Sequence, residues 1–225
     1  MSKYQFVIDE INPESTHGKI LSKIKPGSKV LECGCASGYM TRYMHEKMGC
    51  SVDVIEINRV DLEQAEQWAN RSYCGNLDED RWLDFVAGNK YNYILFADVL
   101  EHLRNPKSAL YCASKYLADN GKIIVSIPNI CHNDIMIRMY YDLFTYTKIG
   151  LLDDTHIHFW GMKDFILMCS EIGLNADECD CITYPTGTTE QRSDLSLIDQ
   201  NLVECLKKRE FGEVYQFVFS CSNKR

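Results

Sequence analysis

The sequence has no long hydrophobic run: no stretch of its 225 residues reaches the roughly 18 consecutive apolar residues that a membrane-spanning helix needs. Its beginning, MSKYQFVIDEINPE, lacks the apolar core of a secretory signal. Positive charge is scarce as well, with 24 lysines and arginines against 32 aspartates and glutamates, and no basic stripe is present to neutralise phosphates. We therefore expect a soluble, cytoplasmic protein with no membrane span and no nucleic-acid partner.

The cysteines, although eleven in number, lack the spacing of a zinc site. Cys33 and Cys35 form a C-x-C pair, as do Cys179 and Cys181, but the C-x₂₋₄-C spacing of structural zinc ligands is missing. Without a secretory signal, free thiols are expected rather than a disulfide framework. Internal repeats and low-complexity segments are absent, so a single domain covering residues 1–225 is expected.

One stretch, residues 29–40 (KVLECGCASGYM), has the pattern of a strand that ends in a tight turn and leads into a helix. Glu32 is followed by small residues at Gly34, Ala36 and Gly38, which let the backbone approach a ligand closely. The N–H groups and dipole of the new helix favour a polar or anionic ligand group. Ala36 is expected at a negative φ, because its methyl group would otherwise clash in a glycine position.

The spacing of this turn, Glu-x-Gly-x-Ala-x-Gly, departs from the G-x-G-x-x-G fingerprint of dinucleotide-binding proteins. A nicotinamide-dependent dehydrogenase is therefore disfavoured. A different class of nucleotide-like cofactor is indicated.

A second predicted strand, residues 50–58 (CSVDVIEIN), ends on Glu56, about twenty residues after the glycine turn. Ligands of open α/β sheets lie beyond the carboxyl ends of the strands, so Glu56 is placed to accept hydrogen bonds from ribose hydroxyls. The alternative is a carboxylate that caps the next helix, but Asn58 already suits that role.

Further strands are predicted to end near residues 77, 97 and 129, and they alternate with helices, which indicates a doubly wound, mainly parallel sheet. A helix within residues 12–25 is expected to be capped by Asn12. Residues 130–160 are rich in aromatic residues and histidine, and they are expected to form a helical insertion that covers the site as a lid. The same insertion could instead complete the core or make the contact of a homodimer.

With these motifs the chain resembles the class I S-adenosylmethionine (SAM) methyltransferases. The resemblance is greatest to a bacterial branch that reads DVLEHL-x-x-P, S-x-P-N and G-L-L-D-x-T-H, motifs found here at residues 98–106, 126–129 and 150–156. The ubiquinone-pathway O-methyltransferases share the VLEH part, and the bacterial branch is often associated with cell-surface glycan pathways. The resemblance implies a Rossmann-like fold of seven strands, SAM as cofactor, and methyl transfer to an oxygen or nitrogen of a small-molecule or glycan-linked acceptor.

The resemblance also assigns residues to the cofactor. Glu32 and the turn at residues 34–38 would hold the methionine end, Glu56 the ribose, and Asn76 with Leu77 the adenine. A plain turn is the alternative for the adenine pair. The full predicted cofactor-binding set is Glu32, Gly34, Cys35, Ala36, Gly38, Glu56, Ile57, Asn76, Leu77 and Asp98.

Methyl transfer from a sulfonium requires that the acceptor be positioned and, for a hydroxyl, that its proton be removed. A neutral histidine suits the second task at a pH of about 7. The predicted candidates are His102 and His156, with His132 and His158 ranked lower. Catalysis by proximity, without a dedicated base, is the alternative.

A metal-assisted mechanism is a further possibility, because Asp98, Glu101 and His102 would share one face of a helix at i, i+3 and i+4. A similar triad in the ubiquinone-pathway enzymes is thought to hold a divalent metal. The simpler interpretation is a hydrogen-bonded histidine beside a carboxylate in the first turn of a helix, so no metal is assigned. The rival to an enzyme is a non-catalytic SAM-binding partner that regulates a biosynthetic enzyme.

Overall fold

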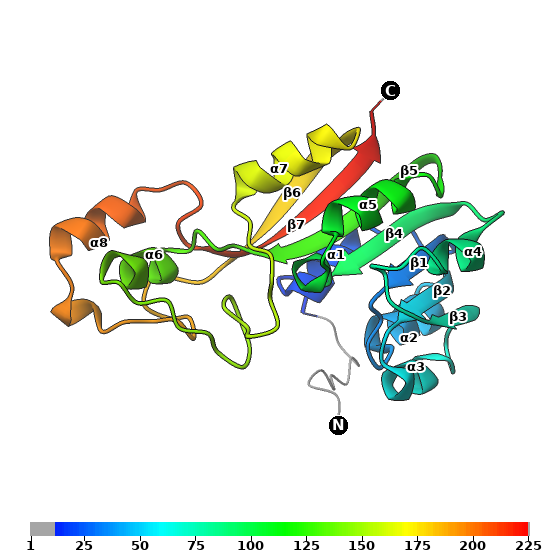
Figure 1. Cartoon of the computed structure of the whole chain (residues 1–225), viewed down its shortest axis with the longest axis horizontal. Coiled ribbons are helices and arrows are strands. Elements are labelled where there is room, and N and C mark those ends of the chain that lie inside the picture. Colours follow the sequence, from blue (N-terminus) through cyan, green and yellow to red (C-terminus); the bar gives the residue numbers. More distant parts are fainter. Residues whose placement is uncertain (1–11, 225) are drawn as a thin grey trace.

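Seven strands form one sheet in the computed structural model, which describes residues 12–224 (Figure 1). The strands are β1 (Lys29–Cys33), β2 (Ser51–Glu56), β3 (Arg71–Cys74), β4 (Tyr91–Ala97), β5 (Leu117–Pro128), β6 (Leu174–Thr183) and β7 (Val214–Asn223). Their order is β3-β2-β1-β4-β5-β7-β6, and all neighbours are parallel except the two pairs that β7 makes. The predicted doubly wound, mainly parallel sheet is confirmed.

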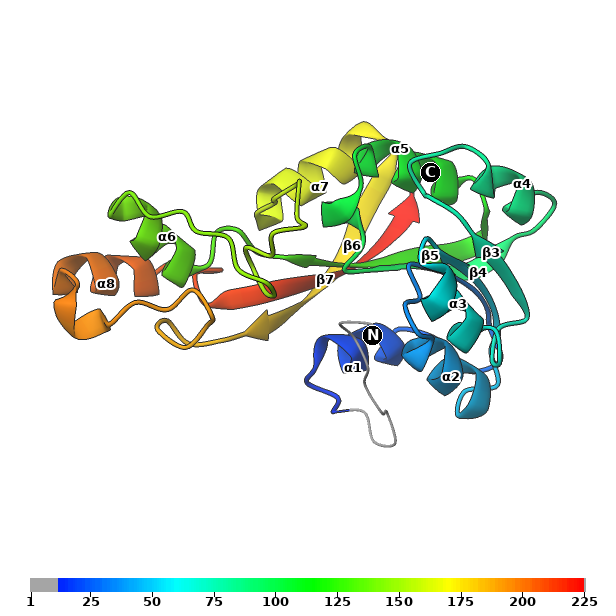
Figure 2. The ribbon, with the colours of Figure 1, turned by 60° about the horizontal axis from the view of Figure 1, so that its bottom comes forward.

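Helices cover both faces of this sheet (Figure 2). They are α1 (Thr16–Ser22), α2 (Tyr39–Glu46), α3 (Arg59–Ala65), α4 (Trp82–Val86), α5 (Pro106–Ser114), α6 (Asn133–Tyr140), α7 (Met162–Glu171) and α8 (Gln200–Lys207). Side chains of α1, α2 and α3 pack in one core, and those of α4, α5 and α7 pack in the other. Among the described residues, 12–224, no helix has both the length and the apolar character needed to cross a bilayer.

The central strands are apolar on both faces because helices cover both faces. In β1, Val30 points into the core beneath α1–α3, and its neighbour Leu31 points into the opposite core. Both side chains are fully buried. Their alternation fixes the register of the strand, since a slip by one residue would exchange the two cores.

The N-terminal helix begins later than the sequence indicated. The N-cap of α1 is Ser15, whose hydroxyl accepts a hydrogen bond from the Gly18 N–H at 3.1 Å. Asn12 instead accepts from the Glu14 N–H at 3.0 Å, in the turn that precedes the helix. The prediction that Asn12 caps the helix was therefore wrong, because the nearer Ser15 satisfies the free N–H groups of the first turn.

The segment between β5 and α7 is helical only over α6, so the expected helical insertion is mostly irregular backbone. Helices α6 and α8 lie beside one another in a lobe at the end of the long β5 and β7 strands (Figures 1 and 2). The later part of the segment returns to the sheet, where the backbone N–H of Ile157 donates to the Glu101 carbonyl at 2.9 Å. Its action as a lid remains a prediction.

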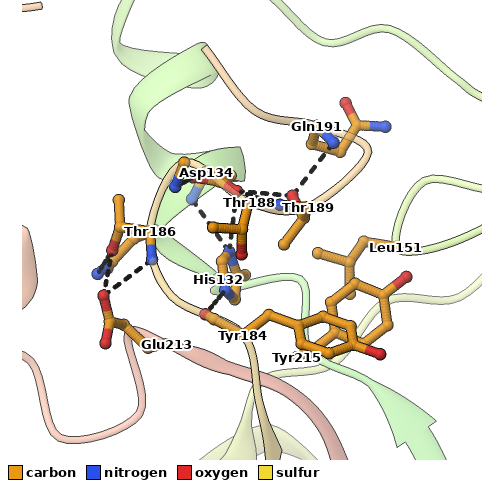
Figure 3. Close-up of polar contacts among 12 residues, drawn as sticks. His132, Asp134, Leu151, Tyr184, Thr186, Thr188, Thr189, Gln191, Glu213 and Tyr215 are labelled. Atoms are coloured by element: carbon orange, nitrogen blue, oxygen red, sulfur yellow. Dashed lines mark hydrogen bonds and ion pairs between the residues drawn. The ribbon is translucent and has the colours of Figure 1, made fainter. Parts of the chain in front are cut away.

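Buried polar groups hold this lobe together (Figure 3). The carboxylate of Asp134 is fully buried and accepts hydrogen bonds from the N–H of Gly187 at 2.6 Å and from the hydroxyl of Thr189 at 2.7 Å. His132 accepts from the Asp134 N–H at Nδ1 and donates from Nε2 to the Tyr184 carbonyl. These bonds fasten the loop after β6 to the first turn of α6.

The turn between β1 and α2 has an unusual backbone. Gly34, Ala36 and Gly38 all have positive φ, at 74°, 47° and 82°. The expectation of a negative φ at Ala36 was wrong, and the alanine accepts the left-handed conformation that the two glycines adopt freely. A Cβ atom built on Gly38 would lie 2.6 Å from the Cα atom of Ala65, so α3 packs directly against the turn.

Replacement of Gly38 by alanine is expected to lower the free energy of unfolding by about 2–4 kcal/mol. The new Cβ atom would be overpacked against Ala65, and a non-glycine residue would be strained at the positive φ. Gly49→Ala is the matched control: Gly49 has φ 64°, but a Cβ atom added there would meet nothing within 4 Å, so only the strain of about 1–2 kcal/mol applies. Urea denaturation of both variants measures the difference. Equal losses would contradict the close packing at Gly38.

Candidate functional site

A cavity of about 830 Å³ lies at the carboxyl ends of β3, β2, β1 and β4. Its size suits a small-molecule or cofactor site, and it lies where the strand order reverses around β1. Each strand end contributes predicted site residues. Those that line the cavity are Gly34 and Ala36 after β1, Glu56 and Ile57 at β2, Asn76 and Leu77 after β3, and Asp98 after β4.

Glu56 ties the turn after β1 to the end of β2. One carboxylate oxygen accepts from the Ala36 N–H and the other from the Asn58 N–H, both at 2.9 Å. Each oxygen keeps acceptor capacity for a ligand in the cavity. Asn58 caps α3 by accepting from the Val60 N–H at 3.0 Å, so Glu56 is not the helix cap.

Three of the predicted cofactor residues do not line the cavity. Glu32 is buried within β1, the side chain of Cys35 is buried, and Gly38 packs against Ala65 of α3. Glu32 is 1% exposed and accepts from the Thr41 hydroxyl at 2.6 Å. Burial, with the charge of Glu56, raises the pKa of Glu32 to about 8 against the effect of that bond, so this carboxyl is mostly neutral at pH 7.

The end of the cavity beyond β3 is closed by the loop that carries Asn76 and Leu77. Asn76 accepts from the Asp78 N–H at 2.9 Å. The Asp78 carboxylate in turn accepts from the N–H groups of Arg104 and Asn105, at 3.0 and 2.9 Å. Asp78 therefore joins the loops after β3 and β4 across the cavity.

Several residues that line the cavity have no local signal in the sequence. Side chains that were not predicted come from α1, α2, α3, the loop after β3 and the segment before α7. They include His17, Tyr39, Asp61, Asp78, Thr155 and Ile157. Tyr39 and Asp78 directly follow predicted residues, but no pattern in the sequence shows which way their side chains point. His17 and Ile157 are brought to the cavity from distant parts of the chain.

Asp98 does not share a helix face with Glu101 and His102. It has φ 55°, and only one short 3-10 turn, Leu100–His102, follows it. Its Oδ1 accepts from the Ser126 hydroxyl at 2.7 Å and from the Gln216 amide. The triad expected at i, i+3 and i+4 is therefore not formed.

A different cluster forms from Glu101, His102 and His156, whose ligand atoms lie within 4.8 Å of one another. It is the one such group of three found in residues 12–224. Glu101 is 1% exposed, and its Oε2 has no hydrogen-bond partner among the described residues. Two imidazoles and a carboxylate form a donor set that suits a divalent transition metal, so the cluster could hold one.

The histidine hydrogen bonds indicate where the protons lie. Nδ1 of His102 is 3.3 Å from the Thr155 carbonyl, and Nδ1 of His156 is 3.4 Å from the Leu151 carbonyl. A carbonyl can only accept, so Nδ1 carries a proton in both rings, and Nε2 is the nitrogen that can accept one. Of these two candidates, only His102 lines the cavity, while the His156 ring packs on it with centroids 4.9 Å apart.

Burial sets the charge within this cluster. It lowers the pKa of His156, with a further decrease from His102, and it raises the pKa of Glu101 well above the usual value. His156 is therefore neutral at pH 7, and the 4.0 Å approach of its Nε2 to Glu101 Oε1 is not an ion pair. Because the ring of His156 is neutral, it can pack against His102 and orient it without placing a second positive charge beside it.

The lower-ranked histidines lie elsewhere. His132 is fully buried in the distal lobe, where both ring nitrogens are used in hydrogen bonds (Figure 3). His158 stacks on Trp160 and donates from Nε2 to the Arg104 carbonyl at 3.3 Å. Neither ring faces the cavity described above.

Comparison with known proteins shows the family. A family model described as a methyltransferase domain matches residues 9–178. Two ubiquinone biosynthesis O-methyltransferases match part of the chain: that of Schizosaccharomyces pombe is 24% identical over 104 residues, and that of Erwinia tasmaniensis is 27% identical over 108 residues. The alignments cover 44% and 46% of this chain but only 38% and 43% of the relatives, so the chain matches less than half their length.

Solved structures agree on the fold. The magnesium protoporphyrin IX methyltransferase of Synechocystis, a structure with bound S-adenosylhomocysteine, has a TM-score of 0.57 at 14% identity and covers 88% of this chain and 75% of its own. Identity at that level establishes the fold alone. The family match over most of the sequence goes further: the chain belongs to the methyltransferase domain family, whose methyl donor is S-adenosylmethionine.

Proposed function

We propose that the protein transfers a methyl group from SAM to a hydroxyl oxygen, or alternatively an amine nitrogen, of a small-molecule or glycan-linked acceptor. The observation that carries this proposal is one cavity with the donor-site residues at four strand ends and, beside them, a histidine nitrogen that can accept a proton. Donor and acceptor can therefore meet in the same space.

The charges of the cavity favour SAM over a dinucleotide. Four carboxylates line it, from Glu56, Asp61, Asp78 and Asp98. A sulfonium with an ammonium group is attracted by such surroundings, whereas the pyrophosphate of NAD is repelled. Glu56, which keeps acceptor capacity on both oxygens, is assigned to the ribose hydroxyls.

The acceptor is assigned to the part of the cavity near His102, where Thr155 and Ile157 supply the outer wall. His102 would remove the hydroxyl proton at Nε2 while the Thr155 carbonyl stabilises the N–H of the other ring nitrogen. A hydroxyl acceptor must lose its proton to a base, and His102 is placed to act as one, so oxygen is favoured over nitrogen. The matched relatives are also named as O-methyltransferases. If a divalent metal binds, Glu101, His102 and His156 would hold it, and it would lower the pKa of the acceptor hydroxyl.

Calorimetric titration with S-adenosylhomocysteine, beside NAD, tests the donor site. Binding of the former alone is expected, and Glu56→Gln should weaken it about tenfold or more, because a charge-assisted hydrogen bond to the ribose is lost. Glu63→Gln, an exposed acid on α3, is the control and should bind as the wild type does.

Thermal unfolding of each variant shows whether the turn remains intact, since Glu56 also holds the Ala36 N–H. A folded Glu56→Gln protein with unaltered affinity would contradict the ribose assignment. Stronger binding of NAD than of S-adenosylhomocysteine would instead support a dehydrogenase.

A screen of sugars and phenols with labelled SAM tests the acceptor side. His102→Gln is expected to lower the turnover of a hydroxyl acceptor by about 100-fold or more while it leaves S-adenosylhomocysteine affinity unchanged, as for loss of a general base. His45→Gln, on the exposed side of α2, should keep full turnover. Full activity of the His102 variant would favour proximity alone, and binding with no turnover of any acceptor would favour a non-catalytic partner.

Chelation separates the two roles of the histidine cluster. If His102 acts as a base without a metal, dialysis of the protein against EDTA should change turnover by less than about twofold, since no step then depends on an ion. A loss that manganese or zinc restores would show instead that Glu101, His102 and His156 hold a metal.

A further inference from the structure

A second cavity, of about 570 Å³, lies between α5 and α7, which cover the same face of the sheet (Figure 2). The segment that leads into α7 contributes to both cavities: Thr155 and Ile157 line the one at the strand ends, whereas His158 and Trp160 line the second. Among the described residues, only Arg104 lines both. The second cavity is large enough for a small molecule, and the proposed function does not account for it.

The two cavities differ in charge. Four carboxylates line the cavity at the strand ends, but among the described residues that line the second cavity there is none. Arg104 and Lys107 bring two positive charges to it, in a chain whose net charge is −8. Lys107 forms an ion pair with Glu171 on α7, and its ammonium group has further N–H donors for a ligand. The second cavity therefore attracts an anion, which the other cavity repels.

The backbone of Arg104 is fixed on both sides, but its side chain is not. The N–H group donates to the Asp78 carboxylate at 3.0 Å, and the carbonyl accepts from Nε2 of His158 at 3.3 Å. The guanidinium group has no hydrogen bond or ion pair with any described residue. Because a guanidinium can bind a phosphate or a carboxylate through two parallel N–H donors, Arg104 is available to an anionic ligand.

The indole of Trp160 offers a donor from inside the cavity. Trp160 is only 8% exposed, and its ring stacks on His158 with centroids 5.6 Å apart. A buried indole N–H usually has a hydrogen-bond partner, yet this one has none within residues 12–224. Since Trp160 lines the cavity, an oxygen atom of a ligand there can supply the missing acceptor.

The first turn of α5 adds further donors. Asn105 is its N-cap, but the Asn105 side chain makes no capping hydrogen bond, and Pro106 has no N–H group. The N–H groups of Lys107 and Ser108 have no acceptor in the part of the chain that the structure describes. These four residues line the cavity. The free N–H groups and the helix dipole both favour a negative charge at this position.

We propose that the second cavity binds a small organic anion, a phosphate or carboxylate group on an apolar body. Its oxygens accept hydrogen bonds from Arg104, from the first turn of α5 and from the indole N–H of Trp160. Two sources have this chemistry: the anionic end of the methyl acceptor, which could reach across Arg104, and a separate small molecule. The apolar body packs against the uncharged wall of the cavity, which consists of Tyr111, Trp160, Met168 and Ile172.

Phenyl phosphate is a suitable probe, because it combines the two parts that inorganic phosphate and phenol have singly. The chain has three tryptophans, so the ¹⁵N–¹H indole signal of Trp160 is identified by its loss in Trp160→Phe. Titration of the labelled protein without cofactor is expected to shift this signal, with a Kd of about 1 mM or below for phenyl phosphate. Inorganic phosphate and phenol are expected to bind at least about tenfold more weakly.

Arg104→Gln is expected to weaken the binding of phenyl phosphate about tenfold, because a charge-assisted hydrogen bond is lost. Arg59→Gln is the matched control. It removes the same charge from an exposed position on α3 that lines neither cavity, and it should bind as the wild type does.

Three results would overturn the proposal. They are no shift of the Trp160 signal up to about 10 mM phenyl phosphate, a shift whose Kd is unaltered in Arg104→Gln, and equal affinity for phenyl phosphate and inorganic phosphate. These measurements need no methyl donor, so failure of the proposed function would not change them.

Inhibition kinetics distinguish the two sources of the anion, once the acceptor screen has given a substrate. If the acceptor's own anionic group occupies the second cavity, phenyl phosphate should raise the KM for the acceptor and leave kcat unchanged. If the anion is a separate ligand, saturation with phenyl phosphate should leave that KM unchanged.

Discussion

The shape of the cavity at the strand ends depends on the carboxylate of Glu56. Its two hydrogen bonds to backbone N–H groups hold Ala36 on one side and Asn58 on the other, so the end of β2 fixes the turn that follows β1. That turn has alternating positive φ angles, a conformation that costs free energy wherever the residue is not glycine. The hydrogen bond that Glu56 accepts from the Ala36 N–H offsets the free-energy cost of the positive φ at Ala36. Without the two hydrogen bonds of Glu56, nothing would hold the left-handed turn in place while α3 packs closely against Gly38.

The sequence was sufficient for the features that depend on local pattern and on parallel-sheet geometry. Strands such as β1 and β4 are apolar on both faces, and the residues after their ends must meet at one edge of the sheet. Gly34, Glu56, Asn76 and Asp98 accordingly line one cavity, and their role in binding the cofactor stays a prediction. The sign of φ at Ala36 could not be predicted in this way, because a hydrogen bond from another strand stabilises it.

The arrangement of the histidines depends on contacts between distant parts of the chain. An i, i+3, i+4 spacing indicates one face only if the segment is helical, and the single 3-10 turn after Asp98 leaves that residue bonded to Ser126 and Gln216. His156 takes its place beside Glu101 because the segment before α7 folds back onto the sheet. Composition suggested a helical lid there, yet the network around Asp134 fastens only the first turn of α6 and the loop after β6.

In the proposed function, the donor and acceptor sides therefore rest on different parts of the chain. The donor residues follow strand ends, whose positions are set by the core. The outer wall near His102 comes from Thr155 and Ile157, in a segment held to the sheet by two backbone bonds to the Glu101 carbonyl, from the N–H groups of Ile157 and His158 at 2.9 and 3.2 Å. Because those bonds involve backbone atoms, side chains in this segment can change without loss of the attachment. If the proposed acceptor assignment holds, the acceptor preference can change while the strand-end residues keep their positions, which fits a fold that serves many acceptors.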